Sequence, residues 1–357
     1  MLGNIKIALL LLLILICNVY TFSSDDTSSM NNPKGGELIW RYMTGDVPSS
    51  PTIYNGRLYV GSLDTYIYCL SAESGDLIWR YKTDLLRYKT GLWVCSSPTI
   101  YNGRLYVGSG GYIYCLSEKS GKLIWRYKIG DWVSSSPTIY NGRLYVGSGD
   151  YIYCLSADSR EPIWRYETGG WVESSPTIYN GWLYVGSDDH YIYCLSAESG
   201  DLIWRYKTGY PVSSSPTIDN GRIYLGSLDT YIYCLSADSG KLIWRYETGD
   251  SVESSPTIYN GRLYVGSDDY YIYCLSAESG ELIWRYKTGY PVSSSPTIYN
   301  GMLYVGSDDT YIYCLSAESG EPIWRYKTGS VVDSSPTIYN GRLYVCSKDN
   351  YIYCLVE

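Results

Sequence analysis

The side chains of this sequence that could bind or react are mostly aromatic and acidic, and they recur about every 40 residues. Trp93, Trp132 and Trp171 occupy equivalent positions in three successive copies of a short polar segment. Exposed aromatic rings anchor proteins or sugar rings, because they offer a large contact area at a small entropic cost. The same rings could instead fill the mouth of a central channel, so the sequence leaves both interpretations open.

Acidic residues take one position of this segment in the fourth, sixth and eighth copies, at Glu173, Glu253 and Asp333. Copies that far apart cannot share one ion, so we expect a diffusely negative mouth rather than a metal site. An insertion around residues 84–90 extends one copy of the segment. Further candidate binding residues in these segments are Leu86, Arg87, Tyr88, Tyr210 and Tyr290.

The cysteines invite a disulfide or metal interpretation, but their spacing favours a structural one. Eight of them share one position of a repeated phrase, YIYC, and packed sheets would hold neighbours roughly 10 Å apart. A disulfide needs Cα atoms within about 4.4–6.8 Å. We therefore expect small buried apolar residues, and no pairing of Cys95 with Cys346. The eight are Cys69, Cys115, Cys154, Cys194, Cys234, Cys274, Cys314 and Cys354.

An Asp precedes the YIYC phrase in most copies, where a tight turn uses its carboxylate to bind the backbone two residues on. The sequence has a single histidine, His190, which stands beside one of these turns. Most mechanisms of imidazole catalysis are therefore excluded. No nucleophile–base pair and no phosphate-binding loop emerges, so we predict no catalytic residue. The Asp residues are Asp64, Asp150, Asp189, Asp229, Asp269, Asp309 and Asp349.

The elements that carry these residues are strands. Four phrases recur eight times each from residue 37 onward: LIWRY, SSPTI, a Leu/Ile-Tyr-Val/Leu run and YIYCL. Each has strand length and strand composition, and four strands per unit make one blade of a β-propeller. Asn-Gly always separates SSPTI from the next phrase and predicts a two-residue hairpin. SPTI should therefore be innermost and LIWRY outermost.

The order of the phrases predicts how the ring closes. The chain begins with LIWRY at residues 38–42 and ends with YIYCL at 351–355, so the last blade lacks its own outer strand. We expect the N-terminal segment to complete that blade with antiparallel pairing. The prediction is an all-β protein, an eight-bladed propeller over residues 37–357.

The remaining sequence suggests export. An apolar run from Ile7 to Cys17 predicts a signal peptide or membrane anchor within residues 1–22, followed by a flexible linker over 23–36. Lipidation of Cys17, cleavage near Ser23 and an uncleaved anchor all stay open. The net charge of −8 and scattered basic residues disfavour nucleic acid as a partner.

Residues 69–79, CLSAESGDLIW, resemble the tryptophan-docking motif of the pyrroloquinoline-quinone-like propeller repeats, Ala-x-Asp-x-x-Thr-Gly-x-x-x-Trp. Gly75 and Trp79 match, whereas Cys69, Ser71 and Ser74 replace the Ala, Asp and Thr. The resemblance extends through all eight blades and implies the fold. One branch of this family comprises quinoprotein dehydrogenases, which bind the quinone and Ca²⁺ through long loops and adjacent cysteines. The other resembles the outer-membrane assembly lipoprotein B, a scaffold without a cofactor.

This sequence is closer to the scaffold branch, since it has no Cys-Cys pair and its loops are short. We expect a non-catalytic extracytoplasmic scaffold, without cofactor or metal, that binds a protein or a glycan on its loops. The alternative is an oxidoreductase that uses pyrroloquinoline quinone and calcium at the acidic mouth. A third hypothesis is a sensor propeller within a larger complex.

Overall fold

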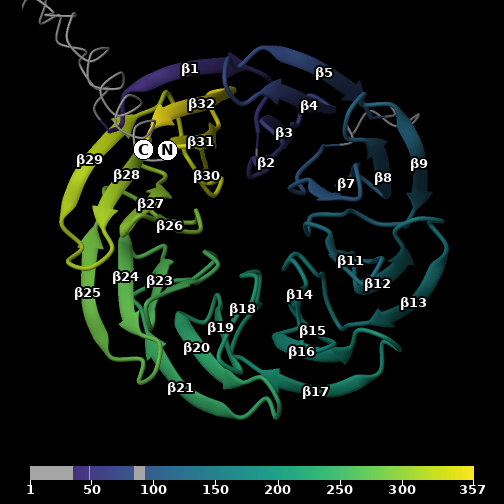
Figure 1. Ribbon diagram of the computed structural model, residues 1–357. Coiled ribbons are helices and arrows are strands. Elements are labelled where there is room, and N and C mark those ends of the chain that lie inside the picture. Colours follow the sequence, from purple (N-terminus) through teal and green to yellow (C-terminus); the bar gives the residue numbers. More distant parts are fainter. Residues whose placement is uncertain (1–34, 48, 84–92) are drawn as a thin grey trace, which may run out of the picture. The chain divides into compact units, whose positions relative to one another are not determined.

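The computed structural model describes residues 35–47, 49–83 and 93–357, which form a ring of eight four-stranded antiparallel sheets (Figure 1). This confirms the predicted all-β, eight-bladed propeller. No helix in these described residues is long and apolar enough to cross a membrane. Residues 1–34, which include the apolar run and Cys17, lie outside the description.

Each blade has four strands, which follow chain order from the centre of the ring to its rim in seven blades, as the phrases predict (Figure 1). The innermost strands are β2 (Thr52–Tyr54), β6 (Thr99–Tyr101), β10 (Thr138–Tyr140), β14 (Thr177–Tyr179), β18 (Thr217–Asp219), β22 (Thr257–Tyr259), β26 (Thr297–Tyr299) and β30 (Thr337–Tyr339). The second strands are β3 (Arg57–Gly61), β7 (Arg104–Ser109), β11 (Arg143–Ser148), β15 (Trp182–Gly186), β19 (Arg222–Gly226), β23 (Arg262–Gly266), β27 (Met302–Gly306) and β31 (Arg342–Ser347).

The outer half of each blade follows the same pattern. The third strands are β4 (Tyr66–Ser71), β8 (Tyr112–Ser117), β12 (Tyr151–Ser156), β16 (Tyr191–Ser196), β20 (Tyr231–Ser236), β24 (Tyr271–Ser276), β28 (Tyr311–Ser316) and β32 (Tyr351–Val356). The outermost strands are β1 (Leu38–Met43), β5 (Leu77–Lys82), β9 (Leu123–Lys128), β13 (Pro162–Glu167), β17 (Leu202–Lys207), β21 (Leu242–Glu247), β25 (Leu282–Lys287) and β29 (Pro322–Lys327). We number the blades 1 to 8 by their innermost strands, from β2 to β30.

The N-terminal strand closes the ring, as predicted. β1 pairs antiparallel with β32, so blade 8 has the order β1-β32-β31-β30. Outside the strands, Gly36 N donates to Val356 O at 2.9 Å and Thr44 N donates to Asn350 O at 2.8 Å. Blade 8 is therefore completed by the two ends of the propeller.

The hydrophobic core lies between blades rather than within them. The second and third strands are buried on both faces, and each core cluster combines two neighbouring blades. In one cluster, Tyr224 and Cys234 of blade 5 pack against Val252, Leu263 and Tyr273 of blade 6. Because each face of a blade packs against a neighbouring blade, no blade can bury its apolar side chains alone.

Side chains bridge the inner strands, which share no β-ladder between blades. Ser50 N donates to Ser97 Oγ at 2.9 Å, and the same bond recurs around the ring until Ser335 N donates to Ser50 Oγ. The Thr two residues after each of these serines donates its hydroxyl to a Pro carbonyl of the next blade, as Thr52 does to Pro98 O at 2.6 Å. The serines of this ring are Ser50, Ser97, Ser136, Ser175, Ser215, Ser255, Ser295 and Ser335.

The outer-strand tryptophans join the rims of neighbouring blades. Trp204 Nε1 donates to Ala237 O of the next blade at 3.0 Å, and its ring lies against Gly240, where a Cβ would approach it to 2.5 Å. Equivalent Trp bonds to the next blade occur from Trp40, Trp79, Trp164, Trp244 and Trp284. The motif that resembles the family repeat is thus a contact between blades.

The eight repeated cysteines are buried, and all ten cysteines of the described residues are free thiols. Burial raises the pKa of the Cys234 thiol to about 12. The turn carboxylates also act as predicted: Asp229 accepts from Tyr231 N at 3.2 Å. Asp150 differs, since its turn is one residue shorter and it directly precedes Tyr151, in the place of Thr230 rather than of Asp229. Its backbone carbonyl accepts from Thr168 N at 2.8 Å, as Thr230 O accepts from Thr248 N.

Candidate functional site

The variable segments of the repeat gather on one end of the disc, which we call the loop face. It consists of the connections from each outer strand to the next inner strand and of the turns between second and third strands. Backbone bonds hold these two sets together; Asp188 N, for example, donates to Trp171 O at 2.8 Å. The opposite end, the turn face, carries the Asn-Gly and Ser-Gly turns, in which residues such as Asn141 have positive φ.

The predicted tryptophan arc lies on the loop face. The rings of Trp93 and Trp132 meet edge to face with centroids 5.6 Å apart. Trp93 is 46% exposed and Trp171 is 47% exposed, while Trp132 is half-buried. Two of the three rings thus offer large apolar area to a ligand, and their role in binding remains a prediction.

Two more aromatic pairs occur on this face. Tyr210 and Tyr290 are 61% and 60% exposed. His190 of the preceding blade stacks against Tyr210 at 5.8 Å, and Tyr270 lies 6.0 Å from Tyr290. Both exposed tyrosines are identifiable from the sequence but their partners are not, because each pair joins segments about 20 residues apart.

A negatively charged cavity of about 540 Å³ opens beside the second of these pairs. Glu253 and Asp333 line it together, as the predicted negative mouth requires, whereas Glu173 is not part of its lining. Lys348 Nζ lies 3.0 Å from Asp333 Oδ2. The charged residues of the lining are Asp250, Glu253, Asp268, Asp308, Asp333 and Lys348.

The crowding of these carboxylates changes their protonation. Burial, reinforced by Glu253 and Asp250, raises the pKa of Asp268 to about 6. Burial and Asp308 raise the pKa of Glu253, and burial is also the main cause of the raised pKa of Asp308. The cavity therefore favours cationic groups that would offset this repulsion.

Four of the six charged residues of this cavity were not identified from the sequence, and one of them, Asp250, lies in the same variable connection as Glu253. Asp268, Asp308 and Lys348 all follow a Gly-Ser or Cys-Ser pair in the turn between second and third strands. The residue after this pair differs among the copies and is Leu63 in blade 1. That variation is the signal by which the sequence could have identified the position. The insertion residues Leu86, Arg87 and Tyr88 lie outside the described residues, so their predicted role in binding stays untested.

The charged groups that line the cavity are not arranged as a calcium site. Among residues 35–47, 49–83 and 93–357, no group of three or more His, Cys, Asp or Glu side chains is arranged to hold a metal ion. Asp333 is already paired with Lys348. Ca²⁺ takes six to eight oxygen ligands, and the ammonium group of Lys348 supplies none.

Comparisons with known proteins agree with the fold. The family model described as the β-propeller of beta-alanine-activating enzyme matches residues 94–300, more than half of the chain. The model described as outer membrane protein assembly factor BamB matches residues 24–112 and 271–356. No curated protein sequence matches the chain significantly.

Solved structures show the same architecture at low sequence identity. BamB from Moraxella catarrhalis superposes with a TM-score of 0.77 at 16% identity, over 90% of this chain and all of that chain. The quinohemoprotein alcohol dehydrogenase from Comamonas testosteroni gives a TM-score of 0.75 at 16% identity, over 90% of this chain and 76% of that one. The chain therefore belongs to the pyrroloquinoline-quinone-like repeat β-propellers, on the branch of the assembly factor BamB.

Proposed function

We propose that this propeller is a non-catalytic extracytoplasmic scaffold that binds a protein partner on its loop face. The observation that carries the proposal is the combination of exposed aromatic rings with the acidic cavity on one end of the disc. Rigid aromatic side chains are the commonest anchors of protein interfaces. The BamB-type match is to a protein described as an assembly factor, which supports a role in binding other proteins.

The charge of the loop face specifies the partner further. Five carboxylates and one ammonium group line the cavity, so the partner's contacting surface should be basic. Steering by opposite charges mainly raises the association rate and weakens as salt increases. A glycan ligand for the aromatic rings is the runner-up.

An oxidoreductase is the second candidate function, supported by the structural likeness to a quinohemoprotein dehydrogenase. That likeness is at 16% identity and shows the fold alone. We place no cofactor in this chain, because the charged groups at the acidic cavity do not fit calcium.

Cross-linking in the native cell envelope, followed by affinity measurement with the purified partner, tests the proposed function. The full-length chain is compared with the triple variant Trp93→Ala, Trp132→Ala and Trp171→Ala. Losing the two exposed rings, together with the Trp132 ring that packs against Trp93, should weaken binding by at least about tenfold. Ile243→Ala is the matched control, because Ile243 is 43% exposed on the rim and should not contact the partner.

The proposal fails if the triple variant binds as the parent chain does, or if Ile243→Ala weakens binding equally. Binding that increases with salt would contradict the basic character of the partner. Binding that is instead lost on adding an oligosaccharide would support the glycan.

A further inference from the structure

Grooves between neighbouring blades recur on the turn face, opposite the acidic cavity. They lie at the junctions of blades 8 and 1, 3 and 4, and 6 and 7, with volumes of about 380, 510 and 380 Å³. In each, one blade contributes a Tyr, an Asn and an Arg, and the next contributes an Ala followed by a Glu. A repeated cavity with the same lining suggests one kind of ligand.

The arginine of each groove reaches across to the next blade. At the junction of blades 3 and 4, Arg143 Nη1 donates to Glu198 O at 2.6 Å, and Tyr145 OH donates to Ala197 O at 2.9 Å. The backbone carbonyl of Glu198 is thus the acceptor, and its exposed side chain stands at the groove edge. Arg342 and Arg262 make the same contact in the other two grooves, to Glu73 O and Glu318 O.

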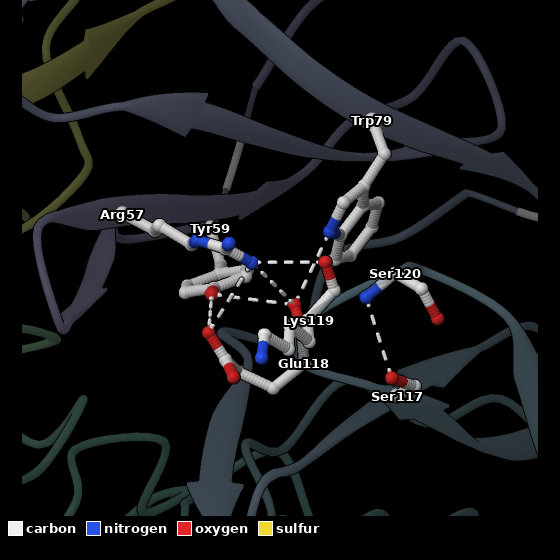
Figure 2. A network of polar contacts seen from close by, with 7 residues as sticks. All are labelled: Arg57, Tyr59, Trp79, Ser117, Glu118, Lys119 and Ser120. Atoms are coloured by element: carbon white, nitrogen blue, oxygen red, sulfur yellow. Dashed lines mark hydrogen bonds and ion pairs between the residues drawn. The ribbon is translucent and has the colours of Figure 1, made fainter.

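One junction shows what such a groove receives. Between blades 1 and 2, Glu118 replaces the alanine, and its side chain is almost fully buried between the blades (Figure 2). Tyr59 OH donates to Glu118 Oε1 at 2.5 Å, and Arg57 Nη1 lies 3.6 Å from the same oxygen. A carboxylate of the chain itself therefore lies against the Tyr and Arg that line the open grooves elsewhere.

A second junction repeats this chemistry in a different way. Between blades 2 and 3, Arg104 Nη1 lies 3.0 Å from Asp158 Oδ1. Arginine binds carboxylates preferentially, because its planar donors match the two oxygens. Two junctions thus supply an internal carboxylate to this arginine, whereas the three grooves keep Ala72, Ala197 and Ala317 where Glu118 stands.

We propose that the open grooves bind the carboxylate of an acidic sugar, in the place that the Glu118 carboxylate takes at the junction of blades 1 and 2. The Arg would receive the carboxylate. The Asn amide and the edge Glu carboxylate would bond hydroxyl groups, for which an acidic peptide side chain offers no donor. The Tyr at the end of the inner strand, 38% exposed at Tyr140, gives a face for the sugar ring.

The arrangement around the disc adds multivalency. The three grooves are two or three blades apart, so well-separated units of one long polymer could engage them together, which would raise its overall affinity without new contacts. A polysaccharide with a uronate in its repeating unit fits this geometry. This ligand would bind at the end of the disc opposite the proposed protein partner, so the inference stands apart from the proposed function.

The test is calorimetric titration of the full-length protein with trigalacturonate, maltotriose and triglutamate. We expect trigalacturonate to bind at least about tenfold more tightly than the other two. Each of Ala72→Glu, Ala197→Glu and Ala317→Glu should remove one site, because Glu118 shows that the fold accepts this side chain. Glu118→Ala should add one site by opening the groove between blades 1 and 2.

The two kinds of variant keep the proposal falsifiable even where one substitution unfolds the chain. An unchanged stoichiometry in Glu118→Ala and in the filled variants would overturn it. If maltotriose bound as tightly as trigalacturonate, the carboxylate would not be the recognised group and the proposal would fail. Tighter binding of triglutamate would assign the grooves to an acidic polypeptide instead. No saturable binding of trigalacturonate would also refute it.

Discussion

Replacing Arg160 by glycine should stabilise the propeller, because the tryptophan-docking turn of blade 3 has Arg160 where the other turns have glycine. Arg160 has φ of 62°, whereas the equivalent position is glycine in the other turns, as at Gly240 with φ of 65°. Trp125, which faces this turn, has no partner for its buried Nε1, while Trp204 donates to Ala237 O at 3.0 Å. The docking contact between blades 2 and 3 thus combines backbone strain at Arg160 with a missing hydrogen bond at Trp125.

The magnitude follows from these differences. A left-handed conformation disfavours a non-glycine residue by about 1–2 kcal/mol. A restored Trp125 bond would contribute about 1 kcal/mol. The greater entropy of glycine in the unfolded chain offsets roughly 0.5–1 kcal/mol. The free energy of unfolding should therefore rise by about 1–2 kcal/mol in Arg160→Gly.

Urea unfolding followed by tryptophan fluorescence measures this change, with Gly240→Arg as the reciprocal variant. The Cβ that Gly240→Arg introduces would lie 2.5 Å from the Trp204 ring, so this variant should lose at least about 2 kcal/mol. A lower unfolding midpoint in Arg160→Gly would refute the reasoning. So would a Gly240→Arg variant as stable as the parent chain.

Three further predictions follow from single side chains. Asp229→Ala should destabilise the fold by about 2–4 kcal/mol, because the carboxylate accepts from Gly209 N at 2.6 Å and from buried Tyr233 OH at 2.7 Å. Thermal unfolding measures this loss, and an unchanged melting temperature would contradict it. The folded-state pKa of Asp268, about 6, lies above the ordinary 3.8, so its charge destabilises the fold increasingly as pH rises through 6. Asp268→Asn should then stabilise by about 1 kcal/mol at pH 8, after allowance for partial exposure, and by almost nothing at pH 4; an equal gain at both pH values would contradict this. Iodoacetamide at pH 8 should leave Cys234 of the native protein unmodified, because the thiol is buried with a pKa raised to about 12, and rapid alkylation found by mass spectrometry would contradict its place in the core.

The repeat made the fold predictable in detail. Eight copies of four strand-like phrases determine blade number, strand order and closure, because each phrase carries its own hairpin or core signal. The ring of serines was not predictable, since the second serine of SSPTI bonds a serine about 40 residues away in the next blade. A single repeat unit contains no sign of that contact.

The loop face was predictable only in part. Variation among copies identified Trp93, Trp171, Glu253 and Asp333, because positions that need not pack are free to differ. The convergence of Lys348 with Asp333 depends on two segments meeting at the mouth of the ring. Such a meeting follows from the curvature of the propeller and not from the spacing of residues.

The most direct test of the central claim is a titration of the purified full-length protein with pyrroloquinoline quinone and Ca²⁺. Absorbance measures binding, and a dye-linked assay measures oxidation of alcohols and sugars. A non-catalytic scaffold predicts no saturable quinone binding and no turnover at any calcium concentration. Saturable binding with turnover would contradict the account and assign the acidic cavity to an oxidoreductase.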